Sequence, residues 1–159
     1  MKLLSWFVIG MALLGAALPP VVGAQGKPFT VTGVRGVIFG AVLPGVPRVI
    51  SRTDPANSGQ FDIKGVKDTQ VQLTFALPSA MNGPAGAQMP IAFGSSDAGY
   101  SQAQVIGSQI GFDPKQPFTG TLSKNGRGSV FIGATANPVA NQRAGPYTAT
   151  ITLTVTVLP

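Results

Sequence analysis

Residues 147–157 read Tyr-Thr-Ala-Thr-Ile-Thr-Leu-Thr-Val-Thr-Val, so apolar side chains alternate with threonine through the whole stretch. This period of two predicts a β-strand with one buried face and one exposed face. The branched side chains of Val, Ile and Thr strengthen that prediction because they suit a pleated sheet. Such a strand can complete a sheet of its own domain or pair with a partner.

Shorter alternating segments precede this strand, with Gly- and Pro-rich turns between them. Residues 70–77 form the clearest one, and residues 29–39 form another whose alternation slips near Gly33 and Gly36. A β-bulge at the slip would shift the register by one residue and turn Arg35 outward. No segment has convincing helical periodicity. The pattern therefore predicts an all-β fold of about seven or eight short strands, either an antiparallel sandwich or a small barrel.

The Asn125-Gly126 pair lies between two further strand segments, residues 119–124 and 128–135. Asn-Gly favours positive φ at both central positions of a type I′ turn, the preferred connection of a two-residue hairpin. We therefore expect Asn125 and Gly126 to have a structural role at a hairpin turn.

The N-terminal residues 1–24 have the form of a secretory signal peptide. One lysine precedes the apolar run of residues 3–18, and Val-Gly-Ala at 22–24 offers small residues for cleavage. An uncleaved membrane anchor is the alternative, but the run is short and Pro19-Pro20 breaks it. We expect residues 25–159 to form a single exported domain, in the periplasm or at the cell surface, with no integral membrane segment after cleavage.

The composition excludes several kinds of chemistry. The chain has no Cys and no His, and its five acidic residues are all Asp. Triads with His or Cys, disulfides and the usual zinc ligand sets are therefore absent. The net charge is +6, but Lys and Arg are scattered rather than clustered, so we expect no nucleic-acid partner. We predict a protein that is not an enzyme and that has no cofactor and no bound metal.

A few residues remain as candidates for chemistry. Paired aspartates could support an Asp-based hydrolase, and Ser95-Ser96-Asp97 could be a fragment of a calcium site, although turn-stabilising roles are the plainer interpretation. Tyr100, in a polar segment, is a candidate ligand contact. Tyr147 follows Gly145-Pro146 at the start of the last strand, so for Gly145 and Tyr147 we expect a structural role in packing a corner.

The C-terminal half also resembles a known family. Asn125-Gly126, Val-Phe-Ile-Gly-Ala-Thr at 130–135 and Ala-Gly-Pro-Tyr followed by the alternating strand at 144–155 are similar to secreted bacterial domains of the domain-of-unknown-function 4402 type. Val-Ile-Phe-Gly at 37–40 and Gln-Phe-Asp-Ile-Lys-Gly at 60–65 fit the same family. That family looks like the subunits of chaperone–usher pili and the spore coat protein U domain.

The resemblance implies an immunoglobulin-like sandwich with a pilin-like structural or adhesive role at the bacterial surface, and a periplasmic chaperone as a partner. In pilus subunits the fold lacks a strand, and a neighbour's N-terminal extension fills the groove. After the expected cleavage only residues 25–28 precede the first strand, and many pilus subunits have a disulfide that this chain lacks.

These departures leave two alternatives: residues 29–39 are themselves donated to a neighbour, or the domain is complete and is not a polymerising pilin. Gly33, Gly36 and Arg35 make residues 29–39 a poor donor, which favours a complete domain. We expect the last strand to lie inside its own sheet, and we expect any homo-assembly or surface partner to use β-strand edges. The alternative function is a secreted binding module for a glycan or small ligand, with Tyr100 in its site.

Overall fold

The computed structural model describes residues 28–159, so the predicted signal peptide lies outside the described part. That part contains twelve strands and two short 3₁₀ segments. Their bounds are β1 (Thr30–Arg35), β2 (Arg48–Ile50), β3 (Gly59–Lys64), β4 (Gln70–Ala76), β5 (Ala80–Asn82), η1 (Pro84–Gly86), β6 (Gln88–Ala92), β7 (Ala98–Ser101), η2 (Ile106–Ser108), β8 (Ile110–Phe112), β9 (Phe118–Thr121), β10 (Arg127–Ile132), β11 (Ala134–Ala136) and β12 (Thr152–Val157).

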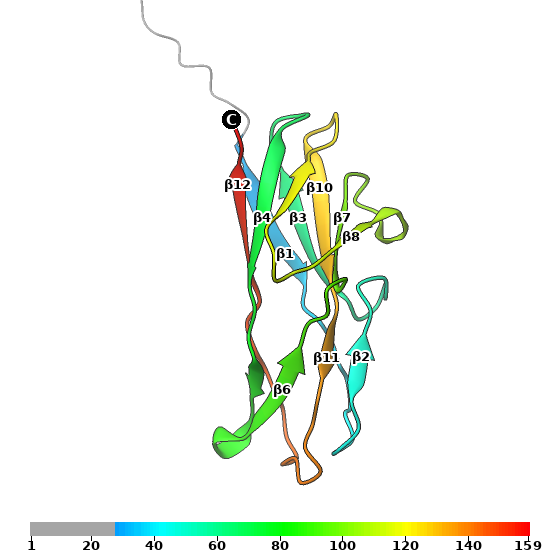
Figure 1. Cartoon of the computed structure of the whole chain (residues 1–159), viewed down its shortest axis with the longest axis vertical. Helices are drawn as coiled ribbons and strands as arrows, with labels where there is room; N and C mark the ends of the chain where they lie inside the picture. The colour runs from blue at the N-terminus through cyan, green and yellow to red at the C-terminus, as the bar shows by residue number, and fades with distance from the viewer. Residues whose placement is uncertain (1–27) are drawn as a thin grey trace, which may run out of the picture.

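The all-β antiparallel sandwich is confirmed, and the expected seven or eight strands were too few. The strands form three antiparallel sheets with the orders β1-β3-β10-β7-β8, β2-β11-β6-β5 and β12-β4-β9 (Figure 1). The excess has two causes: Gly133 divides the segment predicted at residues 128–135 into β10 and β11, and β5 forms beyond Pro78, outside the segment predicted at residues 70–77. Within residues 28–159, no helix has the length and hydrophobicity needed to cross a membrane.

Two groups of buried side chains hold the sheets together. The first, which we call the upper core, lies between the sheet of β10 and the sheet of β4 and consists of Ile63, Val71, Leu73, Ala98, Tyr100, Phe112, Leu122 and Val130. The second, the lower core, lies around β5, β6 and β11 and consists of Met81, Met89, Ile91, Phe93, Ile132, Ala134 and Ala136. The molecule is elongated, and these two cores occupy its opposite ends (Figure 1).

The expected bulge in the first strand is confirmed. Gly33 pairs with Phe61 and Arg35 with Gln60, so Val34 is the extra residue on β1. After the bulge the chain leaves this sheet, and residues 36–42 form no strand. β1 is therefore an edge strand that pairs with β3 alone.

The hairpin expected at Asn125-Gly126 does not form. Only Gly126 has positive φ, at +68°, and its N–H donates to the Ser123 carbonyl over 2.7 Å, so Lys124 and Asn125 are the central residues of the turn. The strands on either side belong to different sheets, because β9 pairs with β4 whereas β10 pairs with β3 and β7. The turn crosses between the two layers of the sandwich.

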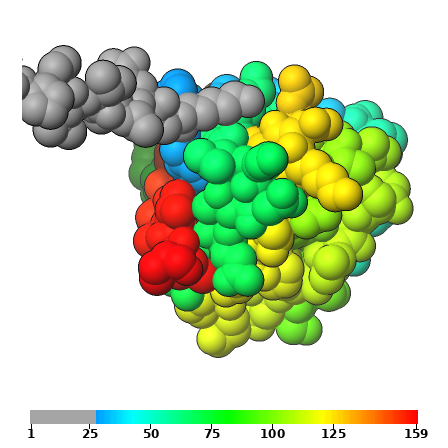
Figure 2. All heavy atoms as spheres, turned by 90° about the horizontal axis from the view of Figure 1, so that it is seen from above, coloured from blue at the N-terminus to red at the C-terminus, as the bar shows by residue number. Residues whose placement is uncertain are grey.

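The last strand is shorter than its pattern predicts and lies at an edge. β12 spans Thr152–Val157 and pairs with β4 from Thr152–Ala76 to Val157–Val71, and within residues 28–159 no strand pairs with its other side. Before β12, only Thr148 forms a bridge, with Asn82. Seen from above, the C-terminal residues form the margin of this end, beside the turn between β3 and β4 (Figure 2). The strand belongs to its own sheet, but only one of its edges is paired.

Candidate functional site

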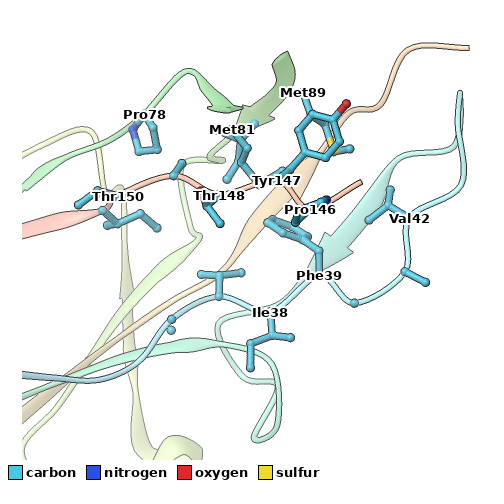
Figure 3. A pocket seen from close by; sticks show the side chains of 18 of the residues that line it. Ile38, Phe39, Val42, Pro78, Met81, Met89, Pro146, Tyr147, Thr148 and Thr150 are labelled. Atoms are coloured by element: carbon cyan, nitrogen blue, oxygen red, sulfur yellow. The ribbon is translucent and has the colours of Figure 1, made fainter. Parts of the chain in front are cut away.

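An open apolar groove lies on one side of the sandwich and has a volume of about 990 Å³. One wall is the segment 36–42 that follows the β1 bulge, and the other is the segment 145–151 that leads into β12. Phe39 and Val42 lie on the first wall, Thr148 and Thr150 on the second (Figure 3). The groove thus lies between the segments 36–42 and 145–151, neither of which forms a regular strand.

The floor of the groove belongs to the lower core. Met81 from β5 and Met89 with Ile91 from β6 line it, and Ile132 from β10 closes it from the opposite sheet. These four side chains are buried, whereas Ile151 on the wall is only half-buried. The lower core is therefore covered incompletely along the length of the groove.

The backbone on both walls has unpaired hydrogen-bonding groups. In segment 36–42, the only backbone bond that the described residues form is from Ile38 N–H to the Asn57 carbonyl, 2.9 Å. In segment 145–151, Thr148 exchanges two bonds with Asn82, at 2.8 and 3.0 Å. No pairing joins the two walls within the described chain. Free N–H and C=O groups beside an apolar floor are the features that accept an added β-strand.

The opposite side of the sandwich is closed. β8 and β9 follow one another there, and the rings of Phe112 and Phe118 stack with centroids 4.2 Å apart. Phe75 stacks on Phe112 at 6.4 Å, and Tyr100 tilts against Phe118 at 5.9 Å. These aromatic rings pack against one another and fill the space between the two sheets on this side.

Tyr147 fixes one end of the groove. Its hydroxyl donates to the Arg143 carbonyl over 2.8 Å and accepts from Gln142 Nε2 over 2.6 Å, while Gln142 Nε2 also donates to the Gln88 carbonyl. A tyrosine hydroxyl bonded to backbone a few residues upstream is the tyrosine-corner arrangement of β-sandwiches. Gly145, with φ of +140°, brings the preceding backbone against the Pro84 ring. Both residues thus pack the corner that leads into the second wall.

Tyr100 lies inside the upper core, on β7, with 3% of its surface exposed. Its hydroxyl donates to the Thr121 carbonyl over 2.7 Å, and burial raises the pKa of the phenol to about 12. The sequence suggested a loop position because Gly and Ser surround this residue, but the main chain continues as a strand that pairs with β10. Tyr100 therefore presents no surface ring on which a sugar could stack.

Four of the five aspartates, Asp54, Asp62, Asp97 and Asp113, accept hydrogen bonds within turns or between strands. Asp54 accepts hydrogen bonds from the Ala56 and Asn57 N–H groups and from the Asn57 side chain, and these bonds lower the pKa of its carboxyl. Asp62 accepts from Ser129 Oγ on the neighbouring strand, and Asp97 accepts from the Gly94 N–H. Among the described residues, no three His, Cys, Asp or Glu side chains converge as metal ligands would.

The sequence did not point to the groove as a site. The alternation predicts residues 36–39 of its first wall as part of the strand segment 29–39, whereas in the structure these residues form no strand. A signal was present in the glycine spacing of residues 33–40, because the predicted bulge marks the point where the chain turns away from its sheet.

Comparisons of the chain with protein-family models and with curated proteins found no match.

Proposed function

We propose that this chain is a non-enzymatic, pilin-like structural or adhesive protein of the bacterial surface, which joins its partner by β-strand addition in the groove. The observation that carries the proposal is the groove itself, an apolar cleft between two segments in which most backbone groups are unpaired within the described residues. An added strand would satisfy those groups and cover the lower core in one step. The predicted signal peptide supports export, and the resemblance to pilus subunits supports a structural role at the surface.

The groove is also the surface that a periplasmic chaperone would cover before assembly. Unpaired backbone edges promote association with other chains when they are left open. A chaperone strand occupying the groove during export is therefore part of the proposal, and it is exchanged for the final partner at the surface.

The glycan-binding alternative has less support because Tyr100 is buried in the upper core. A small apolar ligand in the groove is the form of the alternative that the geometry favours. The small-ligand alternative predicts that the protein stays monomeric at the surface. Strand addition predicts larger assemblies in which a partner's strand occupies the groove of each molecule.

The test is a charged substitution in the groove, expressed in a bacterium that carries the native gene. Ala149 is exposed on the second wall, so Ala149→Asp should leave the fold intact while placing a charge where a strand must lie. Thr119→Asp on β9, also exposed but on the closed side, is the matched control. We expect Ala149→Asp to be lost from surface assemblies and Thr119→Asp to be retained. A wild-type protein found only as a monomer at the surface would contradict the proposal.

A further inference from the structure

The charged side chains that line the groove are both cationic. They are Arg35, at the β1 bulge, and Arg143, at the corner before the second wall. No aspartate is among the residues that line the described groove. The rim therefore presents positive charge beside an apolar floor, without a compensating acid.

Arg35 already has partners within the protein. Its Nε donates to the Ser58 carbonyl over 2.6 Å, its Nη1 to the Pro55 carbonyl over 2.6 Å and its Nη2 to Ser58 Oγ over 3.2 Å. These bonds hold the loop before β3 against the bulge. Its guanidinium is therefore committed to the fold.

Arg143 is placed differently. Its carbonyl accepts the Tyr147 hydroxyl, so its backbone is held at the tyrosine corner, but within residues 28–159 its guanidinium has no hydrogen-bond partner. The side chain is exposed. A fixed backbone with a free guanidinium suits a contact with an incoming group, and guanidinium binds carboxylates in a bidentate geometry.

We propose, on the basis of the strand-addition function, that the groove selects an acidic strand of another protein. The strand has apolar residues at alternate positions facing the Met81–Met89 floor and a carboxylate that pairs with Arg143. Backbone pairing binds strands of any sequence, so the floor and the rim charge supply the selectivity. Charge on a rim acts mainly on partner choice and association rate.

Donation of residues 28–39 by a second copy of this chain is disfavoured by the same argument. Its strand-forming segment 28–39 carries Arg35, and the chain as a whole has a net charge of +6. Placing that segment beside Arg143 would bring like charges together, which is unfavourable in an interface.

The experiment uses purified protein lacking residues 1–24 and dye-labelled peptides of roughly ten residues, with alternating Val and Thr and one Asp at each polar position in turn. Matched peptides carry Lys at the same positions. We expect the best Asp peptide to bind about threefold to tenfold more tightly than its Lys counterpart at low salt, because exposed ion pairs contribute modestly. Raising the salt to about 0.5 M should shrink the difference.

Charge reversal provides the control. Arg143→Glu should reverse the preference, so that the Lys peptide binds more tightly than the Asp peptide. Lys115→Glu, on an exposed loop of the closed side, changes the net charge by the same amount and should leave the preference for the Asp peptide unchanged. Hydrogen exchange should show protection of residues 36–42 and 145–151 by the bound peptide in both proteins.

Several results would overturn the inference. Equal binding of Asp and Lys peptides would contradict selection by charge but would still agree with strand addition. Tighter binding of a peptide copied from residues 28–39 indicates a second copy of the chain as the donor. Failure of every peptide to protect the two walls removes the proposed function as well, and protection by oleate alone identifies the groove as a site for a small amphiphile.

Discussion

The upper and lower cores lie in one sandwich, yet they differ in how completely they are covered. In the upper core, Leu73, Val71 and Ile63 have no exposed surface, and β12 packs Leu153 and Val155 against them. In the lower core the corresponding margin is the groove, where Ile151 and Tyr147 remain half-buried. The C-terminal segment covers the upper core because its residues 152–157 pair with β4 as β12. Its residues 145–151 are outside that pairing and leave the lower core partly uncovered.

The side chains of the two cores differ in the same direction. Four aromatic rings, Phe75, Tyr100, Phe112 and Phe118, make defined contacts in and around the upper core. The lower core has Met81 and Met89 at its open face. Methionine is flexible and polarisable, so it adapts to different occupants better than a stacked aromatic pair does. Under the proposed function, the upper half would maintain the fold and the lower half would receive the partner.

The largest expected effect compares one substitution in each core. Leu73→Ala removes a fully buried side chain of the upper core and should lower the free energy of unfolding by about 3 kcal/mol, because it leaves a cavity. Ile151→Ala removes a half-buried side chain beside the groove and should cost about 1 kcal/mol. Denaturant unfolding of both variants measures the difference. Equal losses would mean that the lower core is as well covered as the upper one.

The second effect concerns the corner that holds one wall of the groove. Tyr147→Phe removes the hydroxyl that bonds the Arg143 carbonyl and the Gln142 side chain, and should cost about 1–2 kcal/mol of unfolding free energy. Hydrogen exchange should rise in residues 142–151 and remain unchanged in the upper core. Gly83→Ala is a companion test, because an added Cβ would overlap the Tyr147 ring. Uniform loosening of both halves would contradict a local role for the corner.

The sequence predicted the upper half better than the lower half, for a physical reason. Alternation in residues 70–77 and 152–157 is regular, and β4 and β12 pair there, with Val71, Leu73, Leu153 and Val155 packed in the upper core. The bulge in β1 also followed from the sequence, since its glycines interrupt the alternation. In each case the local pattern and the tertiary pairing agree, so periodicity alone was informative.

The candidate site could not be predicted in the same way. Residues 147–151 continue the alternation of β12, but alternation does not say whether a neighbouring strand is present on each side. Tyr100 shows that local composition can also mislead. Its Gly- and Ser-rich surroundings suggest a loop, but its ring lies in the upper core against the Gly120 and Gly128 backbones. Small residues that make room for a ring have the same local composition as a turn.

The third effect tests how closed the upper core is. Tyr100→Phe loses the bond to the Thr121 carbonyl and should cost about 1 kcal/mol at neutral pH. Burial raises the pKa of Tyr100 from 10.0 to about 12, so the neutral phenol is favoured in the folded state. The associated stability is complete below pH 10 and is lost as the pH rises through about 12. Unfolding midpoints across this alkaline range should fall more steeply in wild type than in Tyr100→Phe. A phenolate of Tyr100 that forms readily near pH 10 would show that water reaches the upper core.

The smallest expected effect concerns the loop around Asp54, which contacts Arg35 at the β1 bulge, where the first wall of the groove begins. Asp54 holds the loop that receives Arg35 at the bulge, and the pKa of its carboxyl is lowered, first by the Asn57 side chain, then by the Ala56 and Asn57 N–H groups, and last by Arg35. A lowered pKa contributes stability that is present above the unfolded value of 3.8 and is lost as the pH falls through the folded value.

Asp54→Asn should therefore flatten the acid limb of a plot of unfolding midpoint against pH, with a small change at neutral pH. Asp68→Asn is the matched control, because the Asp68 side chain accepts no hydrogen bond within the described residues. Since Arg35 lines the groove as well as the bulge, acid should also increase hydrogen exchange in residues 36–42 before it affects the upper core. Simultaneous exchange in both regions would mean that the loop and bulge contacts do not set where the sandwich opens.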